Sequence, residues 1–190
     1  MNRPKIIALV GMAGSGKGTC TDFISQTYHV PVVHFGNMVY EEVERRGLDI
    51  VQHEREVRED MRKKEGRAVL AKRAAEKAQK FLANGEKGVV LDGLYSWTEY
   101  KHLRSMFDDD LAVIAVIAPR QLRYERIVNR KDSRRSYTKE QVEKRDIEEI
   151  ENLEKGGPIA MADYTITNDA TSEEMLANLR TILTAIQFAE

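Results

Sequence analysis

The sequence predicts an α/β fold in which a five-stranded parallel sheet is covered by helices on both faces. Short apolar runs alternate with longer segments of helical periodicity along all 190 residues. The run at 111–117 is apolar throughout, as expected of a parallel strand buried on both faces. The segments between successive apolar runs are long enough for the helical crossovers that parallel strands require.

Each element is placed by its own pattern. Strands are expected at the short apolar runs 5–10, 30–35, 89–91, 111–117 and 163–167. Helices are expected where apolar residues recur at helical spacing, at 17–27, 38–46, 52–64, 68–82, 96–106, 119–130, 138–155 and 171–188. Gly47 breaks the second helical pattern, and the residues 84–88 form a strong turn signal before the third strand.

We expect one domain, 1–190, because this length lies within the usual range of a single domain. Its core is predicted at 1–37 and 84–190. The helical segment 38–83 is too long for a simple crossover, so it is expected to form an insertion between the second and third strands. The segment 131–137 is short, polar and basic.

The charge balance excludes several classes of partner. The chain has 30 basic and 31 acidic residues and a net charge of −1, which gives no global attraction to nucleic acid or anionic membranes. The single cysteine, Cys20, cannot form an internal disulfide, and no apolar run approaches the length of a membrane span. We therefore expect a cytoplasmic monomer or homodimer with a small-molecule partner, and no nucleic-acid or membrane partner.

Residues 11–19 carry the clearest chemical motif, G-x-x-G-x-G-K-G-T, directly after the first predicted strand. A strand, a glycine-rich turn and a helix form the layout of a phosphate-binding loop. The glycines let backbone N–H groups approach phosphates, and Lys17 supplies a mobile cation. We expect the nucleotide to contact Gly11, Met12, Ala13, Gly14, Ser15, Gly16, Lys17, Gly18, Thr19 and Cys20. The alternative is ordinary packing of a strand, a turn and a helix.

Asp92 is the second candidate, because it follows the strand predicted at 89–91. The carboxyl ends of parallel strands meet at one edge of the sheet, so Asp92 is expected beside the loop. There it can hold Mg²⁺ together with Thr19, directly or through water. It can instead act as a base toward an acceptor hydroxyl. The remaining alternative is that Asp92 starts a turn or caps the next helix.

Arginines gather around the fourth crossover, at positions 120, 123, 126, 130, 134, 135 and 145. Arg126 and Arg130 share a helix face because they are four residues apart. Guanidinium groups supply forked donors that suit the oxygens of a transferring phosphoryl group. We expect Arg126, Arg130 and Arg145 to neutralise phosphate charge, and we interpret Arg123 as part of a solvated helix face. Such a face is also the alternative for the whole set.

Together these segments resemble the nucleoside-monophosphate-kinase superfamily, whose adenylate kinases carry a similar G-x-x-G-x-G-K-G-T loop, across nearly the whole chain. The resemblance implies a three-layer P-loop fold that uses ATP and Mg²⁺. It places Arg126 near the donor adenine and Arg130 near the donor phosphates. It also implies that the insertion 38–83 binds the acceptor and that the segment 131–137 forms a short lid. The segment 162–168 is similar to a late strand of dephospho-CoA kinases, which implies that Asn168 lies near the adenine.

Overall, the chain most resembles a group of P-loop kinase-like proteins, mostly archaeal, that are often described as dephospho-CoA-kinase-related. The segments 34–42 and 62–66 resemble the corresponding segments of that group.

The departures from the superfamily pattern concern the acceptor. Tyr40 and Tyr95 stand near two positions where these kinases usually carry arginines for an acceptor phosphate. Arg58, Arg62 and Arg73 are available from the inserted helices as substitutes. We expect the acceptor to contact Phe35, Gly36, Asn37, Tyr40, Arg62, Arg73, Gly93 and Tyr95. The alternative for the two tyrosines is ordinary partly buried packing.

The sequence thus predicts an ATP- and Mg²⁺-dependent kinase in which Lys17, Asp92, Arg126, Arg130 and Arg145 carry the chemistry. The acceptor is expected to be a nucleotide or a nucleotide-like molecule. Two alternatives stay open at this point. One is a kinase directed at a hydroxyl, such as a dephospho-CoA or nucleoside kinase. The other is a P-loop ATPase or switch that has no small-molecule acceptor.

Overall fold

The computed structural model describes residues 3–130 and 137–189. Its strands form one parallel sheet in the order β2–β3–β1–β4–β5. The strands are β1 (Ile6–Val10), β2 (Val32–His34), β3 (Val89–Asp92), β4 (Leu111–Ile117) and β5 (Tyr164–Thr167). All four neighbouring pairs are parallel, which confirms the predicted sheet.

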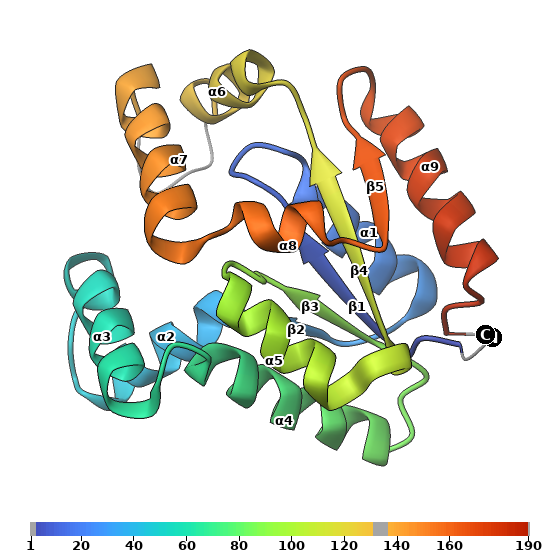
Figure 1. The fold of residues 1–190 in the computed structure, drawn as a ribbon, viewed down its shortest axis with the longest axis horizontal. Coiled ribbons are helices and arrows are strands. Elements are labelled where there is room, and N and C mark those ends of the chain that lie inside the picture. Colours follow the sequence, from blue (N-terminus) through green and yellow to red (C-terminus); the bar gives the residue numbers. More distant parts are fainter. Residues whose placement is uncertain (1–2, 131–136, 190) are drawn as a thin grey trace.

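Helices lie on both faces of this sheet (Figure 1). They are α1 (Lys17–Tyr28), α2 (Phe35–Arg45), α3 (Ile50–Glu65), α4 (Val69–Ala83), α5 (Trp97–Phe107), α6 (Arg120–Val128), α7 (Lys139–Leu153), α8 (Gly156–Ala160) and α9 (Ser172–Ala185), with a 3-10 turn at Asp108–Asp110. In the part of the chain that the structure describes, no helix is long and apolar enough to cross a membrane.

The alternation of side chains along β1 divides the core into two clusters. Ile6 and Ala8 belong to the cluster that α4 and α5 cover, whereas Ile7 and Leu9 belong to the cluster that α1 and α9 cover. All five residues of β1 are buried, because β3 and β4 flank the strand and helices cover both of its faces. The three-layer architecture is therefore confirmed.

Several element boundaries differ from the sequence-based expectation, and two of the differences have a clear local cause. The second strand is shorter than 30–35, because the chain turns into α2 directly at Phe35. The helix expected at 138–155 ends at Leu153, where Glu154 adopts a left-handed conformation with φ 53°. A short helix, α8, then follows; Pro158 lies in its first turn, where proline costs no hydrogen bond.

The strand order gathers the chemical motifs at one edge of the sheet. The loop after β1, the end of β3 and the loop after β4 all lie at the carboxyl ends of neighbouring strands. Helices α2 and α3 extend to one side of this edge, and α7 lies opposite α3 (Figure 1). Of the lid expected at 131–137, only Tyr137 lies within the described residues.

Candidate active site

The phosphate-binding loop between β1 and α1 is held in a conformation that requires glycine. Gly14 and Gly16 have φ values of 77° and 100°, which side-chain-bearing residues rarely adopt. A Cβ at Gly14 would lie 2.6 Å from the Arg123 carbonyl oxygen, and a Cβ at Gly16 would lie 2.2 Å from Nδ2 of Asn168. The loop is thus pressed closely against α6 and the end of β5.

The loop also fits a phosphate chain chemically. The hydroxyl of Ser15 is buried and finds no hydrogen-bond partner among residues 3–130 and 137–189. Buried polar atoms normally have partners, so this atom is suited to a ligand. Lys17 begins α1, whose N-terminus favours negative charge. A nucleotide's phosphates therefore match the donors that this loop presents.

Lys17, Asp92 and His34 meet at the carboxyl edge of the sheet. The Lys17 ammonium donates to Oδ1 of Asp92, and Nδ1 of His34 lies 3.0 Å from Oδ2 of the same carboxylate. Strand pairing explains the contact, because His34 and Asp92 are register partners on β2 and β3. Asp92 is thus directed at both the loop and the β2 terminus.

The Lys17 ammonium is charged. Burial alone would lower the pKa of Lys17, but the Asp92 carboxylate, through its charge and its hydrogen bond, helps to raise it above its ordinary value. A charged ammonium that is already bonded to a carboxylate at the loop is a mobile cation for an incoming phosphate.

Thr19 and Asp92 are the residues suited to Mg²⁺. Thr19 is exposed on the first turn of α1, and Asp92 is half-buried at the end of β3. No cluster of three or more His, Cys, Asp or Glu side chains suited to a metal occurs among the described residues. This composition fits Mg²⁺, which proteins usually hold through one or two side chains together with substrate phosphates.

Arg126 and Asn168 meet on the opposite side of the loop. The Arg126 guanidinium donates to the backbone carbonyl and to Oδ1 of Asn168, at 3.2 and 3.1 Å. The Asn168 amide in turn donates to the carbonyl of Ser15 at 2.8 Å. The structure therefore brings together three residues that the sequence assigned to the donor nucleotide.

Arg123 corrects one interpretation from the sequence. Instead of lying on a solvated helix face, it is buried and donates to the Ala13 carbonyl at 2.9 Å. Its guanidinium also bonds both oxygens of Asp146 on α7, at 3.3 and 2.6 Å. Arg123 thus ties the phosphate-binding loop to α7.

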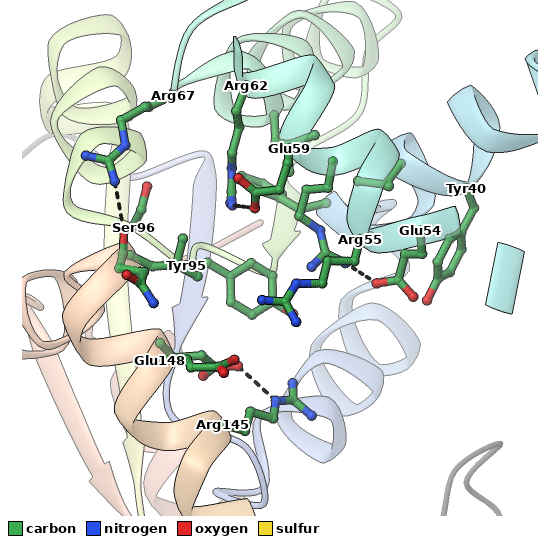
Figure 2. A pocket seen from close by; sticks show the side chains of 18 of the residues that line it. Tyr40, Glu54, Arg55, Glu59, Arg62, Arg67, Tyr95, Ser96, Arg145 and Glu148 are labelled. Carbon is green, nitrogen blue, oxygen red and sulfur yellow. Dashed lines mark hydrogen bonds and ion pairs between the residues drawn. The ribbon is translucent and has the colours of Figure 1, made fainter. Parts of the chain in front are cut away.

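A large pocket opens between α3 and α7 (Figure 2). It is called the acceptor pocket here because several of the residues expected to contact an acceptor line it. Its volume is about 1230 Å³. Its walls include Phe35, Gly36 and Tyr40 of α2, Arg55, Arg58 and Arg62 of α3, Tyr95 and Ser96 after β3, and Arg130, Arg145, Glu148 and Glu149 on the side of α7. Arg67 spans from one wall to the other, donating to the Asn152 carbonyl at 2.9 Å.

Tyr95 stands at the junction of the loop and this pocket. Glu99 accepts the backbone N–H groups of Tyr95 and Ser96, each at 3.0 Å, and so fixes the start of α5. Gly93 makes room for the ring, because a Cβ there would lie 2.9 Å from Tyr95 Cε2. Burial raises the pKa of Tyr95, so the phenol keeps its proton and can donate a hydrogen bond.

Some predicted site residues lie elsewhere. Cys20 faces the core beside Met175, and burial raises the pKa of its thiol to about 12, so its side chain does not reach the phosphate site. Arg73 pairs with Glu65 at 2.7 Å and is absent from the acceptor pocket. Asn37 is exposed on α2 and does not line the pocket either.

Sequence reasoning also missed several residues. The role of Glu99 could have been predicted, because Ser96-x-x-Glu99 is a capping-box pattern that the structure forms. His34 could have been predicted as a site residue, because it is the last residue of a strand that ends at the edge of the sheet where the site lies. Asp146, Glu149 and Lys155 gave no such signal, because their partners are defined only when α7 packs against the site.

Comparisons with known proteins agree with this geometry. A family model described as an AAA domain matches residues 10–144. A UPF0200/UPF0201 protein of Archaeoglobus fulgidus is 35% identical over 181 residues, which cover 94% of this chain and 55% of the relative. The chain thus spans about half the length of that relative. A UPF0200 protein of Thermococcus onnurineus is 36% identical over 173 residues, covering 89% of this chain and 91% of the relative.

Solved structures resemble the chain in fold. A shikimate kinase from Bacteroides thetaiotaomicron aligns with a TM-score of 0.61 at 14% identity, covering 96% of this chain and 98% of that one. A gluconokinase from Sinorhizobium meliloti aligns with a TM-score of 0.58 at 15% identity, covering 98% of both chains. The chain therefore has the α/β fold of P-loop kinases. These comparisons do not show a relation to dephospho-CoA kinases in particular.

Proposed function

The chain belongs to the UPF0200 family, and we propose that it is an ATP-dependent kinase that transfers the γ-phosphoryl group to a nucleotide or nucleotide-like acceptor. One observation carries the proposal. The Lys17–Asp92 contact lies at the end of β3, and the chain that follows β3 brings Tyr95 into the wall of a pocket large enough for a second substrate. The fold it shares with a shikimate kinase and a gluconokinase supports a kinase.

On the donor side, the backbone of the loop and Lys17 would hold the phosphates of ATP. Thr19 and Asp92 would hold Mg²⁺, which would neutralise charge on the donor phosphates. The contact of Asn168 with Ser15 and Arg126 supports an adenine-side role for that pair. Once phosphates draw Lys17 away, Asp92 retains His34 as a partner.

On the acceptor side, the segment 38–83 would act as the binding insertion, because α2 and α3 supply one wall of the pocket. Arg130 and Arg145 would neutralise charge on the transferring group from the opposite wall. Catalysis of this kind is mostly positioning and charge neutralisation, so few residues need to react covalently.

A hydroxyl acceptor, as in a dephospho-CoA or nucleoside kinase, is a second candidate that one observation favours. The His34–Asp92 pair provides a hydrogen-bonded carboxylate at the acceptor end of the sheet, which suits removal of a hydroxyl proton. A phosphate acceptor is already ionised and needs cations instead. A pure ATPase or switch is disfavoured, because it has no need of the acceptor pocket.

The test is a coupled ADP-release assay with Mg-ATP and a panel of nucleoside monophosphates, nucleosides and dephospho-CoA. We expect one acceptor class to stimulate ADP release by the wild type. Lys17→Ala and Asp92→Asn should each abolish this stimulation. If no acceptor raises ADP release above basal hydrolysis while ATP still binds, the transferase proposal fails for these substrates.

A further inference from the structure

Lys155 is a lysine in an unusual place. Only 1% of its surface is exposed, and its ammonium donates to Oε2 of Glu149 at 2.6 Å. The same ammonium lies 4.7 Å from the centroid of the Tyr95 ring. Tyr95 in turn lines the acceptor pocket (Figure 2). Lys155 therefore lies directly behind a side chain of the site.

Glu149 pairs both with this buried lysine and with Arg145, which lines the pocket. Its Oε1 accepts from Nε of Arg145 at 3.0 Å, and Arg145 lines the acceptor pocket. Burial would raise the pKa of Glu149, but Lys155 and Arg145 hold it below its ordinary value. One carboxylate thus fixes two cations, one facing the pocket and one supporting Tyr95.

The charges of this cluster do not cancel. Arg145 and Lys155 together carry two positive charges against the single carboxylate of Glu149, whereas Lys17 and Asp92 neutralise each other nearby. The Arg145 side chain is 42% exposed and lines the pocket, so the positive charge that Glu149 does not balance is accessible to an anion there. A phosphoryl group in transfer between the loop and the pocket provides such an anion.

A buried ion pair is by itself weak evidence of a stabilising role. Burial lowers the pKa of Lys155 despite its carboxylate partner, which means that its charge is held at a cost. Buried ion pairs can often be replaced by uncharged residues of similar volume without loss of stability. Both members instead contact side chains that face the acceptor pocket.

We propose that the Glu149–Lys155 pair positions Tyr95 and Arg145 for phosphoryl transfer, so that Lys155 is a positioning residue of the active site. This inference rests on the proposed kinase function. Lys155 supports the ring from behind, while Glu149 fixes the direction of the Arg145 guanidinium. The Tyr95 phenol and the Arg145 guanidinium then face the same pocket at fixed positions.

The test compares Lys155→Met, Glu149→Gln and the double variant, which removes the charges while nearly keeping the volume. The readouts are thermal stability, the KM for Mg-ATP, and kcat for ADP release with the stimulating acceptor or, failing one, with water. The matched control is Lys77→Met, which removes a lysine from an exposed ion pair with Glu41. The control is expected to match the wild type in kcat.

We expect Lys155→Met to lower kcat by about tenfold to a hundredfold, with the KM for Mg-ATP within about twofold of the wild type. The double variant should regain stability and yet keep the low kcat. A purely structural pair predicts the opposite, because restoring stability would then restore kcat. Recovery of kcat in the double variant would overturn the inference.

A second readout does not require activity. Fluorine NMR of protein labelled with 3-fluorotyrosine reports the Tyr95 ring, with its resonance assigned by Tyr95→Phe. The inference expects this resonance to shift or broaden in Lys155→Met and in the double variant, but not in Lys77→Met. If the wild type turns over no ATP, the proposed function fails, and an unchanged Tyr95 resonance would refute the positioning role separately.

Discussion

Arg123 and Asp146 form a buried ion pair beneath the phosphate-binding loop, with 2.6 Å between Nη2 of the arginine and Oδ2 of the aspartate. Because Arg123 also donates to the Ala13 carbonyl, the loop and α7 share one guanidinium. The acceptor pocket lies against the same helix α7. The phosphate-binding loop and the α7 wall of the acceptor pocket are therefore connected through the Arg123 side chain.

Arg123→Met is expected to destabilise the fold by about 3–5 kcal/mol, because it leaves Asp146 buried without its cation. It should also weaken ATP binding, since the Ala13 carbonyl loses its donor. Chemical denaturation and a nucleotide titration measure the two effects. Arg120→Met is the control, because Arg120 is exposed and its ion pair with Glu143, at 3.4 Å, is long and exposed to solvent. A loss below about 1 kcal/mol in both variants would contradict the connection.

Gly16→Ala should abolish nucleotide binding and destabilise the protein by about 1–3 kcal/mol. The added Cβ would lie 2.2 Å from the Asn168 amide at a backbone φ of 100°, so both the loop and the Asn168 contact must shift. Gly18→Ala is the matched control: its Cβ meets no described atom within 4 Å, and it lies in the first turn of α1. Thermal unfolding should show Gly18→Ala at least as stable as the wild type, and equal destabilisation of both variants would argue against this loop geometry.

The buried carboxylate Glu42 should make stability depend on acid. Hydrogen bonds from Arg45 and then Arg46 lower the pKa of Glu42 from 4.5 to about 2. A carboxyl group whose pKa is lower in the folded state stabilises the fold above its unfolded pKa, and this contribution is lost as the pH falls through the folded pKa. Stability should therefore decline between pH 4.5 and about 2.

Glu42→Gln checks this expectation. The variant should lose on the order of 2 kcal/mol at neutral pH, since Arg45 is exposed and solvent screens part of the attraction. Its free energy of unfolding should then change less than that of the wild type in the acid range. Parallel pH profiles for the two proteins would show that Glu42 is not responsible.

The fold and the donor loop were predictable because their signals are local. Apolar runs, glycines and helical spacing lie within short windows, so the order of strands and helices and the position of Lys17 follow from them. The position of Asp92 was predictable as well, because a residue at the end of a parallel strand lies at the carboxyl edge of the sheet. These inferences needed no knowledge of which helices pack together.

The acceptor side was predictable only in part, because it depends on contacts between distant segments. Arg123 meets Asp146 across 23 positions, which no spacing on α6 reveals. Arg73 was expected in the pocket, but the turn before α4 leaves it beside Glu65. Tyr95, which is expected in the sequence analysis to contact the acceptor, lines the pocket, whereas the Glu149–Lys155 pair was not foreseen.

The fate of the γ-phosphoryl group tests most directly whether the protein is a kinase. Phosphorus NMR of reactions with Mg-ATP and each candidate acceptor measures ADP, inorganic phosphate and phosphorylated acceptor together. We expect one phosphorylated acceptor to form per ADP in the wild type, and none in Lys17→Met. If ADP appears only with an equal amount of inorganic phosphate, whichever acceptor is present, the protein is an ATPase and the kinase proposal is wrong.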